Sequence, residues 1–276
     1  MGIYLEGLEP DFDVRQELHF IGGVLDLRQF DKIFISVSGG KDSHAMLFLI
    51  KALAEKQEAT DRLLCMYADT GMEWYNAETH VKKICRAAGV PLEIVYPVRP
   101  MIELFKFRME RVSQNGKSFT KVAFPSAACR YCTAMQKCDP MDKLIRKYSG
   151  KLLKITGERW QESYSRSFLS EFVKLDRLST KKNSVYRQVY GWRPMLVFQT
   201  QDVFQMIKDS GVERHPCYDL GTSRLGCAGC IFSSDRDLKI EMENNPLIFE
   251  QLDKLEVDSG FTISPTGKLI RDRIKS

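Results

Sequence analysis

The stretch DKIFISVSGGKDSHAMLFLIKALAEK, residues 31–56, decides the fold. Residues 31–38 are rich in apolar and β-branched side chains and predict a short strand that ends at a pair of glycines. Residues 41–56 repeat apolar side chains at helical spacing, with an acidic and a small polar residue in the first turn, and predict a helix. A strand, a glycine turn and a helix in this order form the repeating unit of parallel α/β sheets.

The same pattern returns along the chain. Further strands are expected at 62–71, 92–98, 151–159 and 186–196, and further helices at 74–88, 102–112 and 200–211. Because strands that alternate with helices are joined by right-handed crossovers, we expect an α/β fold of the Rossmann-like kind. Its sheet should be mainly parallel and twisted, with helices on both faces.

The composition excludes several classes of protein. The 276 residues include 41 Lys and Arg against 36 Asp and Glu, a formal net charge of +5, and 43% are hydrophobic. This is typical of an ordinary globular protein and argues against a small disulfide scaffold or a disordered chain. The charge tolerates a polyanionic partner but includes no strong basic block. With no secretory pattern at the N-terminus and no run of about 18 apolar residues, we expect a cytoplasmic protein with no membrane partner.

The glycine turn predicts a phosphate-binding loop. The seven loop residues expected to contact the ligand are Ser36, Ser38, Gly39, Gly40, Lys41, Asp42 and Ser43. Glycines allow the backbone to approach a ligand closely, and the N–H groups at the start of the helix form a nest for an anion. The loop matches neither the Walker A pattern nor the dinucleotide-binding G-x-G-x-x-G. A ligand bound after the first strand also fits the position at which open α/β sheets bind ligands.

The ends of the chain are expected to form separate parts. Apolar spacing from Val14 to Leu27 predicts an amphipathic helix, and residues 235–258 predict a charged helix. We therefore expect a helical lead-in at 1–30, a nucleotide-binding α/β domain at 31–200 and a small cysteine-bearing helical lobe at 201–276.

The eight cysteines indicate metal or redox chemistry. Cys65 and Cys85 lie in an apolar run and on a predicted helix, so we expect them to be buried structural thiols. The others include two short groups, Cys129-x2-Cys132 and Cys217-x9-Cys227-x2-Cys230. Four thiolates suit either zinc or an iron–sulfur cluster, and the spacing alone leaves both open.

Five ordered segments resemble the adenine nucleotide α-hydrolase-like group, which contains ATP pyrophosphatases and phosphoadenosine phosphosulfate (PAPS) reductases. The first is the SGGKDS loop, which matches the family signature SGGxDS. The other four are Asp69-Thr70-Gly71-x-Glu73, Arg130-x-Cys132-Thr133 with Lys137 and Pro140, Gly157-Glu158-Arg159 with Glu162, Ser163 and Arg166, and His215 through Cys230. Together they span about 70% of the chain.

The resemblance implies a nucleotide site. The loop would bind the phosphates of ATP with Mg²⁺, or those of PAPS, and five residues would lie beside the nucleotide: Asp69, Thr70, Gly71, Gly157 and Glu158. In the pyrophosphatase branch, Lys41 and Ser43 would stabilise the departing pyrophosphate, and Asp42 would be a metal or water ligand.

Arg159 and Arg166 have two interpretations. Their guanidinium groups are suited to grip phosphate or a DNA backbone. Alternatively, they are surface arginines paired with Glu158 and Glu162.

The resemblance also favours a [4Fe–4S] cluster over zinc. The expected ligands are Cys132, Cys217, Cys227 and Cys230, with Cys129 as the alternative to Cys132. Cys138 is expected to pack against a helix rather than bind metal.

Two activities of the family are considered. A PAPS reductase, which produces sulfite, uses a cysteine near its C-terminus, and this chain has no cysteine after Cys230. We therefore favour an ATP pyrophosphatase that activates an acceptor for sulfur insertion. The preferred setting is DNA phosphorothioation, with a cysteine desulfurase as the sulfur donor and with DNA and other phosphorothioation proteins as partners. The alternatives are a PAPS reductase, a tRNA-thiolating enzyme and a nucleotide-binding sensor without catalysis.

Overall fold

The computed structural model describes residues 12–114, 124–180, 185–264 and 266–275. The chain forms two compact units, each built from separate stretches of sequence. The sheet unit comprises Met1–Tyr67, Val81–Glu93 and Asp142–Arg214. The cysteine unit comprises Ala68–His80, Ile94–Met141 and His215–Ser276.

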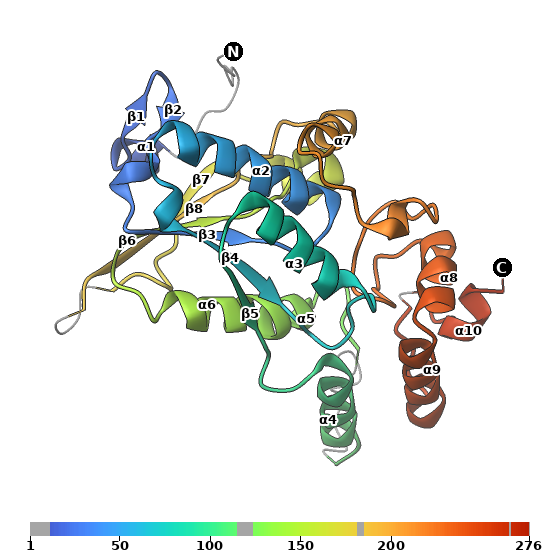
Figure 1. Cartoon of the computed structure of the whole chain (residues 1–276). Helices are drawn as coiled ribbons and strands as arrows, with labels where there is room; N and C mark the ends of the chain where they lie inside the picture. Colours follow the sequence, from blue (N-terminus) through green and yellow to red (C-terminus); the bar gives the residue numbers. More distant parts are fainter. Residues whose placement is uncertain (1–11, 115–123, 181–184, 265, 276) are drawn as a thin grey trace. The chain divides into compact units, whose positions relative to one another are not determined.

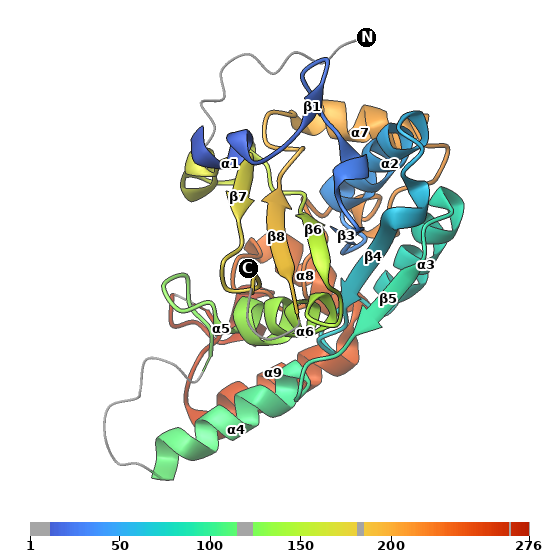
Figure 2. The same ribbon diagram turned by 90° about the vertical axis from the view of Figure 1, so that its left-hand side faces the viewer.

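A six-stranded sheet forms the core of the fold in the described residues (Figures 1 and 2). The strand order is β5-β4-β3-β6-β8-β7. The strands are β3 (Lys32–Ser36), β4 (Leu63–Ala68), β5 (Leu92–Val95), β6 (Gly150–Ile155), β7 (Phe172–Lys174) and β8 (Arg187–Trp192). β3 pairs in parallel with both β4 and β6, and β6 pairs in parallel with β8, whereas β7 is antiparallel to β8. The predicted mainly parallel α/β sheet is confirmed.

Helices cover both faces of the sheet (Figure 1). α2 (Lys41–Lys56) and α7 (Thr200–Asp209) pack together on one face, and α6 (Asp139–Ile145) lies on the other. The side chains of β3 pack against the helices on both faces of the sheet, because alternate residues of a strand point to opposite faces. Phe34, for example, meets the ring of Tyr148, just after α6, with a centroid distance of 5.1 Å.

The described residues also form several other elements. They are α1 (Phe12–Gln16), β1 (Phe20–Ile21), β2 (Val24–Leu25), α3 (Ala77–Ala88), α4 (Met101–Gln114), α5 (Tyr131–Thr133), a π-helical turn (Ala134–Cys138), α8 (Asp235–Asn244), α9 (Pro246–Ser259) and α10 (Ile270–Arg273). The short 3-10 turns are Leu27–Gln29, Thr60–Arg62, Trp160–Glu162, Tyr164–Phe168 and Pro216–Tyr218. No helix in these described stretches is both long and apolar enough to cross a membrane.

The N-terminal helix expected from Val14 to Leu27 is wrong for most of its length. α1 ends at Gln16, and an antiparallel hairpin of β1 and β2 follows. Its turn consists of Gly22 and Gly23, whose φ angles are +57° and +79°. Two consecutive residues in the left-handed region interrupt a right-handed helix and suit a tight hairpin turn. Residues 1–11 of the expected lead-in lie outside the described residues.

The single charged helix expected at 235–258 is also wrong, because the structure forms two helices there. α8 ends before Asn245, and α9 begins at Pro246. Proline lacks an N–H group and clashes with the preceding turn, so it interrupts one helix but fits the first position of the next. The antiparallel strand β7, in the polar stretch between β6 and β8, was not predicted.

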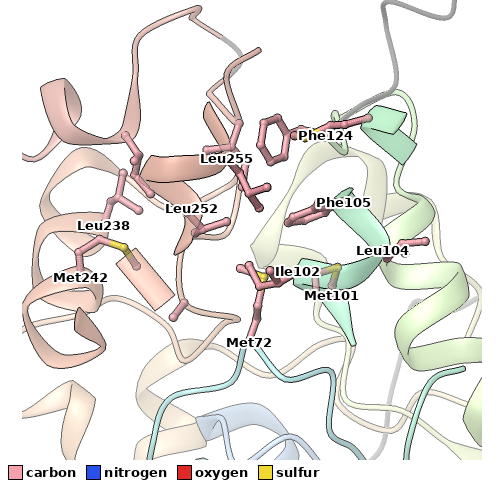
Figure 3. Close-up of a cluster of buried hydrophobic side chains, with 14 of the residues drawn as sticks. Met72, Met101, Ile102, Leu104, Phe105, Phe124, Leu238, Met242, Leu252 and Leu255 are labelled. Atoms are coloured by element: carbon pink, nitrogen blue, oxygen red, sulfur yellow. The ribbon is translucent and has the colours of Figure 1, made fainter. Parts of the chain in front are cut away.

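The cysteine unit has its own hydrophobic core, in which α4 packs against α9 (Figure 3). Its buried members come from segments far apart in sequence, among them Met72, Phe105, Leu238 and Leu252. Cys129, Cys132 and Cys227 are partly buried against this core. The core therefore brings the Cys129–Cys132 pair and Cys227 to the same apolar surface.

A buried carboxyl group holds the Cys227–Cys230 turn. Glu241 of α8 is fully buried, and it accepts hydrogen bonds from the backbone N–H of Gly229 at 3.1 Å and from Ser233 Oγ at 2.8 Å. Gly229 has a φ of +76°, and an added Cβ would lie 2.4 Å from Leu252 Cδ1, so only glycine fits there. Burial raises the pKa of Glu241 to about 7.

The raised pKa of Glu241 predicts a dependence of stability on pH. Because the folded state favours the protonated carboxyl group, its contribution is complete below pH 4.5 and is lost as the pH rises through about 7. The loss corresponds to up to about 3 kcal/mol. The neutral Glu241→Gln variant should therefore be more stable than the parent above pH 7, with a flatter pH profile, in urea unfolding followed between pH 5 and 8.5. A parent advantage at pH 8 would show instead that the ionised carboxylate is needed.

Candidate functional site

The loop between β3 and α2 is held by serine hydroxyl groups. Ser43 Oγ donates to the carbonyl oxygen of Gly40 at 3.0 Å and accepts from the backbone N–H of Ser38 at 3.1 Å. The Ser38 and Ser43 hydroxyl oxygens are 3.2 Å apart. Gly39 has a φ of +77°, which a side chain would oppose. The predicted loop residues are thus brought together in one rigid turn.

The start of α2 is suited to an anion. Its N-cap residue is Gly40, and within the described chain no side chain caps it. The first N–H groups of a helix need partners from outside the helix, and its dipole favours negative charge there. The buried hydroxyl of Ser36 also has no hydrogen-bond partner among the described residues. Such groups in a protein interior normally bind a ligand or water.

Asp42 joins two cationic side chains in the sheet unit. Its Oδ2 is 3.4 Å from Lys41 Nζ, and its Oδ1 accepts a short hydrogen bond from Arg159 Nε. Arg159 is almost fully buried and also donates to the carbonyl oxygen of Phe198 at 3.1 Å and to Thr200 Oγ1 at 3.3 Å. Its guanidinium group is therefore occupied by partners from the chain itself, and it holds Asp42 in place. The interpretation of Arg159 as a surface arginine paired with Glu158 or Glu162 does not agree with this burial.

Gly157 lies against the backbone of Asp42. A Cβ at Gly157 would be 3.4 Å from both the carbonyl carbon and the carbonyl oxygen of Asp42, so the two chain segments are in close contact. The neighbouring Glu158 points toward Arg193, with 3.9 Å between Glu158 Oε2 and Arg193 Nε. Both residues, predicted to bind the nucleotide, therefore lie on the segment that packs beside the loop.

Arg166 is paired with Glu162, which agrees with the interpretation of this residue as a surface arginine in an ion pair. Its guanidinium group contacts Glu162 Oε2, and the same oxygen accepts from the backbone N–H of Arg159 at 2.8 Å. The segment forms two 3-10 turns that meet at Ser163, rather than one helix. Arg166 is partly exposed, unlike Arg159.

In the cysteine unit, Asp69, Thr70 and Gly71 form a turn closed by their own side chains. Asp69 Oδ1 accepts from the backbone N–H of Gly71 at 2.9 Å, and Gly71 has a φ of +77°. Glu73 Oε2 accepts from the Thr70 backbone N–H at 2.9 Å, from Thr70 Oγ1 at 2.7 Å and from the Met72 backbone N–H at 3.2 Å. We call residues 69–73 the acidic turn. Its shape depends on the Glu73 carboxylate.

The other oxygen of Glu73 faces a cysteine and a lysine. Glu73 Oε1 is 3.7 Å from Cys227 Sγ, which donates to it, and 3.8 Å from Lys137 Nζ. The Lys137 ammonium group also interacts with the Cys227 sulfur. A second link joins the same segments, because the backbone N–H of Ala228 donates to the carbonyl oxygen of Met72 at 2.7 Å. The Cys227–Cys230 turn is therefore attached to the acidic turn.

Burial favours the protonated form of the Cys132 and Cys227 thiols. It raises the pKa of Cys227 to about 12, although the Lys137 ammonium group opposes the shift. Burial also raises the pKa of Cys132, and the Cys230 thiol contributes in the same direction. Cys230 Sγ accepts from Arg224 Nη2 at 3.3 Å. Cys132 and Cys227 thus lie against apolar side chains, and cationic groups lie beside the sulfur atoms of Cys227 and Cys230.

Cys217 lies in a separate local arrangement. It is fully buried, and its backbone N–H donates to His215 Nδ1 at 3.1 Å. Burial lowers the pKa of His215 to about 4, so this ring is neutral. In the part of the chain that the structure describes, no group of three or more His, Cys, Asp or Glu side chains is arranged to hold a metal ion. The four predicted ligands are therefore not assembled as a metal centre.

The remaining cysteines vary in burial. Cys65 and Cys85 are both buried, as predicted for structural thiols, and they interact with each other through a hydrogen bond. Cys129 and Cys138 are partly exposed. The backbone N–H of Cys129 donates to Ser126 Oγ at 3.1 Å.

Sequence reasoning missed the roles of two residues. Glu73 and Lys137 stood in the resembling segments, but no function was assigned to them. Their position in those segments was the available signal. Their partnership with Cys227 joins residues up to 154 positions apart in sequence, and such long-range pairs are not visible in local spacing.

Proteins of other organisms are similar to this chain over most of its length. An uncharacterized protein of Methanocaldococcus jannaschii is 25% identical over 78% of this chain and 45% of its own length. An uncharacterized 37.8 kDa protein of Escherichia phage 186 is 27% identical over 74% of this chain and 68% of its own length. This chain thus spans less than half of the first relative. The structure of a U34-tRNA thiolase from Methanococcus maripaludis, with its [4Fe–4S] cluster, shares 16% identity over 96% of this chain and 75% of that chain, at a TM-score of 0.43.

Shorter matches, over 66 to 108 residues, are to proteins named as sulfurtransferases from Methanocaldococcus jannaschii, Anaeromyxobacter and Pyrococcus horikoshii. A family model described as the phosphoadenosine phosphosulfate reductase domain matches residues 32–232, which includes the phosphate loop and every predicted metal ligand. This match covers well over half of the 276 residues. The chain therefore belongs to the phosphoadenosine phosphosulfate reductase domain family.

Proposed function

We propose that this protein is an ATP pyrophosphatase that activates an acceptor oxygen for sulfur insertion. The acceptor oxygen attacks the α-phosphorus of ATP, the bond to the bridging oxygen breaks, and pyrophosphate leaves. The acceptor then carries AMP on its oxygen. A sulfur nucleophile displaces AMP and takes the place of that oxygen, so the balance is ATP to AMP and pyrophosphate for each sulfur inserted.

The observation that carries this proposal is the uncapped start of α2 beside a buried hydroxyl without a partner. The glycine turn, the first N–H groups of α2 and Ser36 Oγ offer donors to a phosphate group. Lys41 and Ser43 are buried in the same turn, and their task is to stabilise negative charge on the departing pyrophosphate.

Asp42 and Arg159 act as positioning residues in this proposal. The Asp42 carboxylate already has the cations of Lys41 and Arg159 as partners, so we assign it the task of positioning them rather than that of binding a metal ion. Mg²⁺ arrives with ATP as part of the substrate. Arg159 keeps Asp42, and through it Lys41, in a fixed position. Gly157 permits the close approach that this requires.

The acceptor we favour is a DNA phosphate oxygen, with a cysteine desulfurase supplying the sulfur. Three partial relatives named as sulfurtransferases support sulfur insertion in general. Two of them are named for tRNA positions, so a tRNA base oxygen is the second candidate. The family itself is named for PAPS reduction, which makes PAPS the alternative nucleotide.

The nucleotide chemistry is tested through its products. Purified protein given radiolabelled Mg·ATP should release AMP and pyrophosphate. Lys41→Ala should lower the rate by about 100-fold because it removes a preorganised charge contact. Lys51→Ala is the matched control, because Lys51 lies on the same helix and pairs with Glu55, one turn further along. ADP and phosphate as products would contradict the proposal, and binding without turnover would favour a sensor.

The choice between sulfur insertion and reduction is tested with PAPS. The protein mixed with PAPS, thioredoxin and a reducing system should release no sulfite. Deletion of the gene should remove phosphorothioate from host DNA, measured by mass spectrometry of nuclease digests, without causing a need for cysteine. If the deletion leaves the phosphorothioate content of the DNA unchanged but removes thiolated nucleosides from tRNA, the acceptor is tRNA rather than DNA. Steady sulfite release would replace this proposal with PAPS reduction.

A [4Fe–4S] cluster at Cys132, Cys217, Cys227 and Cys230 stays a prediction. The four thiols are suitable ligands by type, but the described residues do not form a metal-holding group. Cluster binding would require the cysteine segments to move together, as metal binding and local folding are often coupled.

Metal analysis tests the cluster prediction directly. Protein purified without oxygen should contain about four irons per chain and absorb visible light. Ser replacement of Cys227 or Cys230 should abolish this iron, whereas Cys138→Ser, a cysteine not expected to bind metal, should leave it unchanged. Comparison of Cys129→Ser with Cys132→Ser identifies the fourth ligand. One zinc per chain, without iron, would make the zinc alternative correct.

A further inference from the structure

The two oxygens of the Glu73 carboxylate serve two different segments of the cysteine unit. Oε2 closes the acidic turn through Thr70 and Met72, and Oε1 faces Cys227 and Lys137. Because a carboxylate is planar and rigid, one oxygen cannot move without moving the other. A change at the sulfur or the ammonium group therefore changes the hydrogen bonds that shape the turn.

We propose that Glu73 is a positioning residue that couples nucleotide binding at the acidic turn to the state of Cys227 and Lys137. This inference rests on the proposed function and on the expectation, drawn from the family resemblance, that Asp69, Thr70 and Gly71 lie beside the nucleotide. Coupling of this kind is reciprocal. If the contact of Lys137 with Glu73 increases the affinity for ATP, bound ATP strengthens that contact by the same free energy. Binding of the nucleotide would thereby change the interactions of Cys227 with Glu73 and Lys137.

The Glu73 carboxylate has two separate roles: it accepts hydrogen bonds from the acidic turn, and its negative charge attracts Lys137. The three donors from Thr70 and Met72 need an acceptor, which the amide oxygen of glutamine also provides. The Lys137 ammonium group needs negative charge, which glutamine lacks. Glu73→Gln is therefore expected to keep the turn and lose the attraction to Lys137. Glu73→Ala is expected to lose both.

A competing route exists through the backbone. The Ala228 N–H donates to the Met72 carbonyl oxygen, so the Cys227–Cys230 turn can also affect the acidic turn without Glu73. Lys137 could also act on the nucleotide directly. Both possibilities predict that the effect of a Lys137 variant persists when Glu73 is changed, which makes the two routes separable by a double-mutant cycle.

The experiment measures ATP affinity by isothermal titration calorimetry for the parent, Lys137→Met, Glu73→Gln and the double variant. Lys137→Met should weaken ATP binding by at least about fivefold in the parent, the lower end of typical coupling. In the Glu73→Gln background the same change should alter affinity by less than about twofold. Glu73→Ala should weaken binding more than Glu73→Gln, because only alanine leaves the turn without an acceptor.

Lys143→Met is the control, because it removes an exposed lysine six positions further along the chain. It should leave ATP affinity unchanged, and thermal unfolding should show that all variants are folded. An equal effect of Lys137→Met in both backgrounds, or no effect in either, would overturn the coupling through Glu73. Failure of the parent protein to bind ATP would instead contradict the proposed function, so the two failures are distinguishable.

Discussion

The two-sided parallel pairing of β3 is the constraint on which the candidate nucleotide site depends. β3 is paired with β4 up to Ser36 and with β6 up to Ile35, and the backbone N–H of Val37 still reaches the Met66 carbonyl oxygen. The sheet therefore satisfies the backbone of this strand almost to its end. The glycine turn and the first turn of α2 follow directly, and the first N–H groups of a helix need partners from outside the helix. The parallel register also brings the chain after β6 to the same edge, where Gly157 meets Asp42.

The main effect of the Asp42–Arg159 ion pair is to fix the position of the phosphate loop, rather than to stabilise the folded state. Removing a charged pair from water costs several kcal/mol per ion, and the mutual attraction often only offsets this cost. Arg159 compensates through further bonds to Phe198 and Thr200, which anchor it to the segment before α7 and to α7 itself. The loop is thereby connected to α7, the helix that packs against α2. This explains why arginine, with several fixed donors, occupies a site where a lysine would make fewer bonds.

Much of the sheet was predictable because its signals are local. The strand, glycine turn and helix at 31–56 form as expected, since apolar spacing and glycine act within a few residues. The N-terminal helix failed because Gly22 and Gly23 override the spacing around them, and the C-terminal helix failed at Pro246. In both places the apolar spacing fits a helix, but glycine or proline interrupts it. The loop and turn residues were identified from motifs, but the burial of Arg159 depends on α7, which follows some forty residues later, and could not be inferred from spacing.

The cysteine unit shows a different limit of sequence reasoning. Motifs identified the cysteines but gave no information about their protonation, which depends on neighbours brought together by the fold. Burial against the apolar core of the cysteine unit raises the pKa of Cys227 to about 12, well above neutral pH. A neutral thiol is a poor nucleophile and a poor metal ligand, so the chemistry of this sulfur depends on what stabilises its negative charge. Within the described residues Lys137 is such a group, and Glu73 holds it. The carboxylate that shapes the acidic turn therefore also pairs with the ammonium group that interacts with this sulfur.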